Sequence, residues 1–328
     1  MVDYLTIFDL MFEQDDFLTR LWGKDYKYQA PEVTTQRAKD LAVHMMTEMS
    51  EFLNELPFKS HRIYVDHRID KARLAEEAID ILKYLLGLCL NMDIDARLLQ
   101  ETWIAKSNIV CHRLKQEQAL EKARLERRSL AVLDLDGVIL DSHTAWLDWV
   151  HAQTGRRFKT RMMARVGLGN EDYEGLKDTY RRTEKATIPQ FRGMDRLVDL
   201  LHQRGLLVVI VTARPFNRYV NLLGDTVESL RGIDYDLLFA DAHKRERLRP
   251  HCDMIRVVIE DDLDQAIGLS NPWTTTLLIR NDENRRLVVP EGIVDIGHPE
   301  GLVALISRNP YFPATFAQIP LPGMEDPR

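Results

Sequence analysis

Two aspartates and a glycine follow a short apolar run near the middle of the chain. The run, residues 130–133, is typical of a buried parallel strand, and α/β sheets carry their chemistry just beyond the carboxyl ends of such strands. Asp134 and Asp136 alternate about Leu135, so both carboxylates can address one site, and Gly137 lets the backbone turn sharply. This arrangement suits Mg²⁺ and a phosphoryl group.

Later segments of the chain supply further groups for phosphoryl transfer. Asp134 is placed as a nucleophile, because a carboxylate can accept a phosphoryl group as an acyl phosphate. Asp136, one strand period away, can protonate the leaving oxygen and then activate water. Hydroxyl, guanidinium and ammonium groups stabilise phosphate charge, and carboxylates bind Mg²⁺. The candidate phosphate-binding residues are Thr212, Arg214 and Lys244, and the candidate metal ligands are Asp134, Asp136, Asp261 and Asp262.

These segments resemble a known superfamily in their order along the chain. The stretch DLDGVILDS, the VTARP segment, a lysine and an acidic pair are similar to the four motifs of haloacid dehalogenase (HAD) superfamily phosphatases, over about residues 129–305. The resemblance implies a three-layer Rossmann-like core, bound Mg²⁺ and a phosphoaspartate on Asp134. Three arginines crowd Lys244, so its assignment stays open, as does the choice between Asp261 and Asp262 as the main metal ligand.

Two pairs of carboxylates in the first half of the chain are each spaced three residues apart. Glu48 with Glu51, and Glu77 with Asp80, would each share one face of a helix. Glu48 and Glu77 also lie within apolar stripes, where an unpaired charge is costly. Four carboxylates facing one another across helices would form a divalent-metal cradle. The alternative is that they form structural ion pairs on solvated helices.

The spacing of these carboxylates also resembles a family. E-x-x-E followed by E-x-x-D is similar to the all-α NTP pyrophosphatases, which include the dimeric dUTPases and the MazG-like proteins, over about residues 1–115. The segment FLNELPFKSHR resembles the dimeric dUTPase branch. The resemblance implies that the four carboxylates hold Mg²⁺, with Mn²⁺ as a substitute, and activate a water that cleaves between the α- and β-phosphates. It further implies nucleotide binding by Lys106, Asn108 and Arg113.

The elements that must position these residues change in kind at about residue 129. Apolar residues recur at helical spacing before it, and short β-rich runs alternate with helices after it, which predicts a mostly parallel sheet with helices on both faces. The predicted strands are 130–134, 206–212, 236–240, 256–260 and 275–279. We expect a multidomain chain with an all-α helical bundle (1–115), a charged helical linker (116–128), an α/β HAD-like domain (129–310) with a small helical cap at about 142–190, and a Pro-rich tail (311–328).

Composition favours a cytoplasmic protein, bacterial or viral, that acts on small nucleotides. The 328 residues carry a formal charge of −7, so a broad electrostatic grip on nucleic acid is disfavoured rather than ruled out. The three scattered cysteines indicate reduced thiols. The longest apolar stretch, 79–90, is too short for a bilayer, so no membrane association is expected. Its apolar character predicts a homo-oligomer, a dimer or larger, formed through the helical half.

The two halves together predict a bifunctional nucleotide hydrolase. The helical half would convert a deoxynucleoside triphosphate, such as dUTP or another pyrimidine nucleotide, into its monophosphate and pyrophosphate. The second half would dephosphorylate a phosphomonoester such as that monophosphate. The alternative is a stand-alone phosphatase for a nucleotide or a nucleic-acid 3′-phosphate, whose helical half serves only in dimerisation or partner binding.

Overall fold

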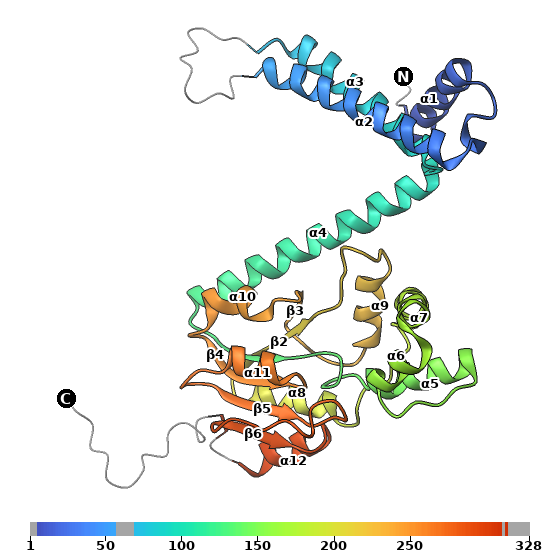
Figure 1. Ribbon diagram of the computed structural model, residues 1–328. Helices are drawn as coiled ribbons and strands as arrows, with labels where there is room; N and C mark the ends of the chain where they lie inside the picture. The colour runs from blue at the N-terminus through green and yellow to red at the C-terminus, as the bar shows by residue number, and fades with distance from the viewer. Residues whose placement is uncertain (1–4, 57–68, 310–311, 314–328) are drawn as a thin grey trace. The chain divides into compact units, whose positions relative to one another are not determined.

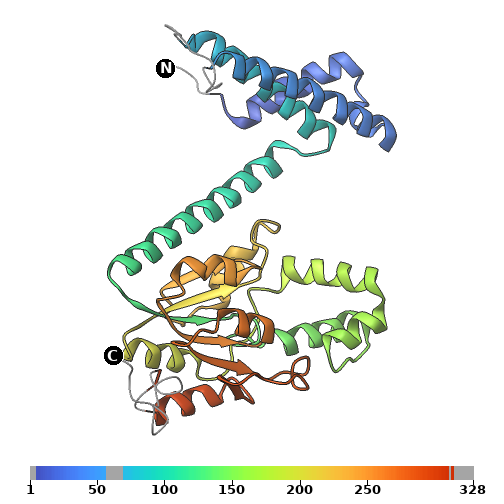
Figure 2. The ribbon, with the colours of Figure 1, turned by 60° about the vertical axis from the view of Figure 1, so that its left-hand side comes forward.

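The chain divides into two compact units, Met1–Ile104 and Ala105–Arg328. A computed structural model describes residues 5–56, 69–309 and 312–313 (Figures 1 and 2). The predicted Pro-rich tail therefore lies almost wholly outside the described residues, as does part of the FLNELPFKSHR segment. Within the described ranges, none of the helices has the length and apolar character needed to cross a membrane.

The first unit is built from helices along its described residues. They are α1 (Ile7–Trp22), the short 3₁₀ helix η1 (Tyr26–Tyr28), α2 (Pro31–Asn54), α3 (Lys71–Asn91) and the first part of α4 (Ala96–Leu125). Local signals explain where they begin. Thr6 and Asp9 form a reciprocal capping box at the start of α1, and the Asp70 carboxylate accepts from backbone N–H groups of α3. Proline stands at the first position of α2, where its missing N–H costs nothing.

The core of the first unit is small. Its buried residues come from α1, η1 and the end of α3, and they are Met11, Leu18, Tyr26, Leu86, Cys89 and Leu90. Helices α2 and α3 pack along each other, as the apolar stripes predicted, but much of the stripe remains uncovered within one chain. Met49 of α2 is 45% exposed and Leu85 of α3 is 42% exposed.

The second unit contains a six-stranded parallel sheet. Its strands are β1 (Ser129–Leu133), β2 (Leu206–Thr212), β3 (Leu237–Ala240), β4 (Ile255–Glu260), β5 (Thr275–Ile279) and β6 (Ile293–Ile296), in the order β3-β2-β1-β4-β5-β6. The predicted parallel sheet is confirmed, and β6 is a strand that the sequence did not predict. The order reverses between β1 and β4, and ligands of doubly wound sheets bind in the crevice at such a switch point.

Alternate residues of the central strands face two separate cores. In β1, Ala131 and Leu133 join one cluster, while Leu130 and Val132 join the other. The first cluster includes apolar residues of α8 (Met194–Gln203) and α12 (Gly301–Arg308). The second includes residues of α10 (Lys244–Leu248) and α11 (Leu263–Leu269). The sheet is therefore the middle of three layers, with helices above and below it in Figure 1.

The charged segment 116–128, predicted as a linker, packs against the sheet and contributes to the second core. Leu120 and Ala123 of α4 are buried in the same cluster as the β1 residues Leu130 and Val132. The side-chain carbonyl of Gln116 also accepts from the backbone N–H of Leu238 at 2.8 Å. The second unit consequently begins earlier than the predicted boundaries, because the end of α4 covers the sheet.

A helical segment lies between β1 and β2 along the chain. It contains α5 (Ser142–Thr154), α6 (Arg161–Leu168) and α7 (Asn170–Thr183), which lie together beside the sheet (green in Figures 1 and 2). We call residues 142–190 the cap. Its own apolar contacts include Trp146, which stacks at 5.7 Å on Trp149 and meets Tyr180 edge-on at 5.0 Å.

Candidate functional site

The switch point of the sheet gathers three acidic residues. Asp134 follows the last residue of β1, Glu260 ends the neighbouring β4, and Asp261 comes next. Because β1 and β4 run parallel and side by side, their carboxyl ends meet at one edge. One carboxylate oxygen from each of the three residues lies within 4.8 Å of the others.

Lys244 is the buried cation of this cluster. It begins α10 and is 3% exposed. Its ammonium Nζ donates at 2.7 Å to Asp134 Oδ1 and at 2.7 Å to Glu260 Oε1. Burial opposes its charge, but the two carboxylates outweigh burial and raise the pKa of Lys244. The lysine predicted among three arginines is therefore the residue that reaches the site.

The acidic cluster suits a divalent cation. Burial, followed by the charge of Asp134, raises the pKa values of Glu260 and Asp261 well above their usual range. Burial also raises the pKa of Asp134, against the opposing effect of Lys244. Glu260 Oε2 is buried and has no hydrogen-bond partner among the described residues. A hard cation such as Mg²⁺ prefers oxygen ligands and would relieve this crowding of charge. The side chains of Asp134, Glu260 and Asp261 are therefore suitable ligands for Mg²⁺.

Asp136 is held apart from the cluster by Arg214. The guanidinium donates from Nη2 to Asp136 Oδ1 at 2.7 Å and from Nε to Oδ2 at 2.9 Å, and Lys185 Nζ lies 3.7 Å from Oδ1. Although burial acts in the opposite direction, Arg214 and Lys185 hold the pKa of Asp136 well below its usual range. The structure thus pairs Arg214 with Asp136 and with Thr226, whose hydroxyl accepts at 2.9 Å.

Close packing fixes the position of Asp261 against the first turn. Gly137 has φ +96°, and a Cβ atom built there would lie 2.1 Å from Asp261 Oδ2. Glycine is needed at this position both for its backbone conformation and for the space. Asn281 Nδ2 donates to Asp261 Oδ2 at 3.1 Å, and Asn284 Nδ2 donates to the Asp261 backbone carbonyl at 2.6 Å. Asp262 instead caps α11, its carboxylate accepting from the backbone N–H of Gln265 at 2.9 Å.

The cluster lies in the wall of a cavity of about 590 Å³. Thr212, at the carboxyl end of β2, lines it, and its Oγ accepts from the backbone N–H of Arg214 at 3.3 Å. The cap supplies much of the opposite wall, including Arg161, Lys177 and Arg181. The cavity therefore joins the sheet edge to the cap.

Several residues of the candidate site were not predicted from the sequence. Glu260 is the last residue of a predicted strand, after the apolar run 257–259, and was not predicted as a residue of the site. Asn281 and Asn284 follow the next strand, β5, so the rule that chemistry lies beyond strand ends could have found them. The cations of the cap lie on helices whose contact with the site depends on tertiary structure.

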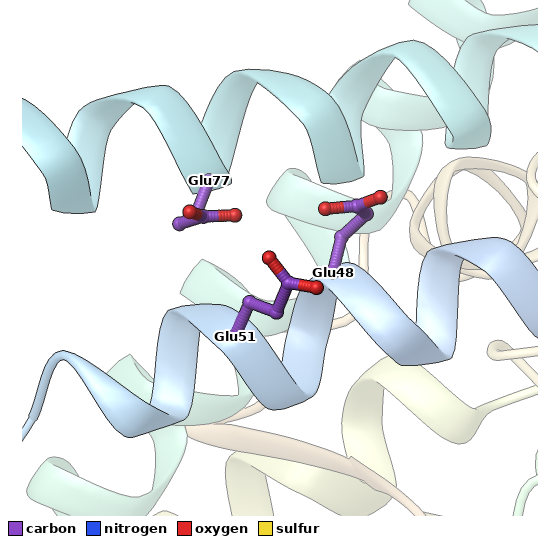
Figure 3. A group of neighbouring side chains, drawn as sticks. All are labelled: Glu48, Glu51 and Glu77. Carbon is purple, nitrogen blue, oxygen red and sulfur yellow. The ribbon is translucent and has the colours of Figure 1, made fainter.

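The first unit brings together three of its four predicted carboxylates. Glu48 and Glu51 of α2 and Glu77 of α3 point toward one another from facing helices (Figure 3), with one oxygen of each within 4.8 Å of the others. Partial desolvation, and then the charges of Glu51 and Glu48, raise the pKa of Glu77. Asp80 lies outside this group, and its Oδ1 accepts from Lys83 Nζ at 3.0 Å.

The three residues predicted to bind nucleotide belong to the second unit, whereas the glutamates belong to the first. Lys106 donates to the backbone carbonyl of Asn217. Asn108 and Arg113 are exposed on α4. The structure thus gives these residues positions on α4, and their binding of a nucleotide stays a prediction.

Comparison with known proteins gives a likeness to solved structures over about 55% of the chain. No family model matches the chain, and no curated protein matches it. Among solved structures, the chain is similar to a dehalogenase (14% identity, 56% of this chain and 98% of that chain, TM-score 0.36). It is also similar to phosphoserine phosphatase from T. onnurineus (14%, 55% and 94%, 0.34) and to a HAD-superfamily hydrolase from Ehrlichia chaffeensis (11%, 55% and 97%, 0.35). At TM-scores below 0.5 the chemistry has to be inferred from the geometry of the site itself.

Proposed function

We propose that the second unit is a Mg²⁺-dependent phosphohydrolase that transfers the phosphoryl group of a phosphomonoester to Asp134. The observation that carries this proposal is the buried contact of Asp134 with Lys244 at 2.7 Å, next to the acidic pair Glu260 and Asp261. A carboxylate beside a fixed cation and a metal-binding cluster can meet a phosphate dianion without prohibitive repulsion. Mg²⁺ held by Asp134, Glu260 and Asp261 would supply the remaining neutralisation of charge.

The residues of the chain have separate tasks in this reaction. The Asp134 carboxylate attacks phosphorus as the bond to the ester oxygen breaks, and water then cleaves the acyl phosphate to release inorganic phosphate. Asp136, ionised by its pairing with Arg214, is suited to take the proton of that water. For Asp136 to protonate the leaving oxygen in the first step, its ion pair with Arg214 has to open and its carboxylate has to take up a proton from solvent. Thr212 contributes a hydroxyl at the end of β2.

The dependence on metal tests this function directly. Wild-type protein should release inorganic phosphate from p-nitrophenyl phosphate in the presence of Mg²⁺, and chelation followed by dialysis should abolish the release. Added Mg²⁺ or Mn²⁺ should restore it. Full activity in the thoroughly chelated protein would contradict a role for the acidic cluster in binding a metal.

We infer a second candidate activity for the first unit, the hydrolysis of a deoxynucleoside triphosphate to its monophosphate and pyrophosphate. What supports it is the cluster of Glu48, Glu51 and Glu77 (Figure 3). In the part of the chain that the structure describes, no salt bridge joins any of the three to a cation, unlike Asp80, which pairs with Lys83. Unpaired clustered carboxylates favour a metal site over the structural ion pairs of the alternative.

Separate assays of the two products test whether the chain is bifunctional. Pyrophosphate release from a panel of deoxynucleoside triphosphates should be lost in Glu77→Gln, while phosphate release from p-nitrophenyl phosphate should persist. Glu76→Gln, a change of the exposed neighbouring residue, is the matched control. Unchanged pyrophosphate release in Glu77→Gln would contradict a catalytic site at the three glutamates. No pyrophosphate release by wild-type protein would leave the phosphohydrolase as the sole activity.

A further inference from the structure

The cap lines the cavity with cations and with no carboxylate. Its charged residues in the cavity wall are Arg161, Lys177, Arg181 and Lys185. Helix α7 also carries acids, but none of them lines the cavity. Asp178, for example, accepts from Arg182 Nε at 2.8 Å and from the Tyr219 hydroxyl at 2.6 Å. The helix therefore directs positive charge toward the cavity.

Two of these cations form no described ion pair, and the ion pair of a third is long. Among the described residues, no salt bridge involves Arg161 or Arg181. Arg161 donates from Nη2 to Ser142 Oγ at 3.1 Å, and its Nε is buried without a described partner. Lys177 Nζ lies 3.8 Å from Glu174 Oε1, at the limit of an ion pair. Lys185, by contrast, faces Asp136.

The arrangement on α7 is costly without an anion. Lys177 and Arg181 stand four residues apart, so they share one helix face, and like charges at this spacing destabilise a helix. Burial, and then the charge of Arg181, lower the pKa of Lys177. An anion bound in the cavity next to both side chains would remove this penalty.

The phosphate transferred to Asp134 does not account for these cations. Its charge is met by Lys244 and by the cation that the acidic cluster would hold, both at the sheet edge. The acids that the core adds to the cavity wall, Asp262, Asp264 and Glu283, form no described ion pair with the cap cations. Positive charge thus remains available on the cap side of the cavity.

We propose, resting on the phosphohydrolase function above, that the substrate is a phosphomonoester whose leaving group carries a second phosphate, and that Arg161, Lys177 and Arg181 bind it. A phosphate dianion matches the charge of three cations better than a single carboxylate does, and arginine presents paired donors to phosphate oxygens. The cap would then select bisphosphorylated over monophosphorylated compounds.

The test compares matched substrates that differ by one phosphate. Inorganic phosphate release is measured for thymidine 3′,5′-bisphosphate against thymidine 5′-monophosphate, and for fructose 1,6-bisphosphate against fructose 6-phosphate. In at least one pair the bisphosphate should have a kcat/KM at least about tenfold higher, the effect of one charge-assisted contact. In Arg181→Gln and Lys177→Gln this ratio should fall to near one. The control is Arg182→Gln, because Arg182 is next to Arg181 in the chain but pairs with Asp178. In this variant the ratio should be unchanged.

Binding without turnover separates this inference from the proposed function. In Asp134→Asn, calorimetry should show the preferred bisphosphate binding at least about tenfold more tightly than its monophosphate, and adding Arg181→Gln should remove the difference. Equal kcat/KM values in both pairs, together with phosphate release that depends on Asp134, would overturn the second-phosphate site and leave the phosphohydrolase standing. Preferential binding of a bisphosphate without any phosphate release would overturn the phosphohydrolase and support the site.

Discussion

Lys244 neutralises two carboxylates that burial would otherwise disfavour. Removing the ammonium would leave Asp134 and Glu260 buried and unpaired, and breaking a buried ion pair on one side is strongly destabilising. We expect Lys244→Met to lower the free energy of unfolding at neutral pH by about 3 kcal/mol. The loss should shrink at acidic pH, because the pKa values of both acids are raised and they take up protons readily. Denaturant titration at two pH values measures both effects.

The matched control for Lys244→Met is Arg245→Gln, since Arg245 is exposed on the same helix. This change should alter the free energy of unfolding by less than about 0.5 kcal/mol. A Lys244→Met protein as stable as wild type would show that the ammonium does not bridge the two acids.

Arg214 sets the protonation state of Asp136. In wild-type protein the guanidinium holds the pKa of Asp136 low, so the carboxylate is ionised and can accept a proton from water across the neutral range. In Arg214→Gln the pKa of Asp136 should rise. On acidification the carboxylate would then take up a proton, and the variant lose activity, at a higher pH than in wild-type protein. The acidic limb of the pH profile of kcat, which includes hydrolysis of the acyl phosphate, should move upward by about one unit or more.

The exposed residue Arg218 provides the control for this shift, and Arg218→Gln should keep the wild-type profile. An acidic limb that stays in place in Arg214→Gln would mean that Asp136 does not act as the base.

Of the acids in the site, Asp134 could be predicted from the sequence and Glu260 could not. Asp134 was predictable because an aspartate after an apolar run stands at the end of a parallel strand. Glu260 was not, because it occupies a strand position and its role depends on Lys244, which lies 16 residues away along the chain. Sequence spacing identifies groups at strand ends, whereas the pairing of buried charges is decided by tertiary structure.

At the scale of elements, the turn after β1 and the end of β4 fit together through Gly137. We expect Gly137→Ala to destabilise the protein by about 1–3 kcal/mol, because its φ of +96° and the nearby Asp261 carboxylate leave no room for a methyl group. It should also reduce phosphate release severely, since Asp261 would have to move. Thermal unfolding and phosphate release measure the two effects.

Gly155 offers the comparison for this substitution. It also has a positive φ of +70°, but no atom lies within 4 Å of a Cβ built there. Gly155→Ala should therefore destabilise the protein by about 1 kcal/mol and retain activity. Equal activity in both variants would argue against the close approach of Asp261.

Strands with a continuous apolar run were predicted correctly, including the four-residue β3. The strands β1, β2, β4 and β5 lie where continuous apolar runs predicted them, because both faces of a parallel sheet are buried. Strand β6 was not predicted because it is no continuous apolar run: Asp295 interrupts it and is exposed. Helix α4 was predicted as charged and solvated, and only the position of the sheet shows why Leu120 and Ala123 interrupt its polar character.

At the scale of the whole molecule, the first unit exposes several large apolar side chains on α1 and α2. Phe12 is 76% exposed and Met46 is 70% exposed. We expect the chain to associate as a dimer or larger through this unit, so light scattering coupled to size exclusion should give at least twice the 38.1 kDa of one chain.

The substitution Met46→Glu should weaken that association, because it places a charge on the apolar surface. Met162→Glu serves as the control, since Met162 is 72% exposed on α6 in the second unit. A monomeric wild-type protein at micromolar concentration would contradict the expected oligomer.

The account as a whole depends on Asp134 as the group that accepts the phosphoryl group. Its most direct test is the rate of inorganic phosphate release from p-nitrophenyl phosphate by Asp134→Asn, with Asp148→Asn, an exposed residue of α5, as the control. We predict that Asp134→Asn lowers kcat at least about 1,000-fold while Asp148→Asn leaves it unchanged. Phosphate release by Asp134→Asn within a few-fold of the wild-type rate would contradict the account.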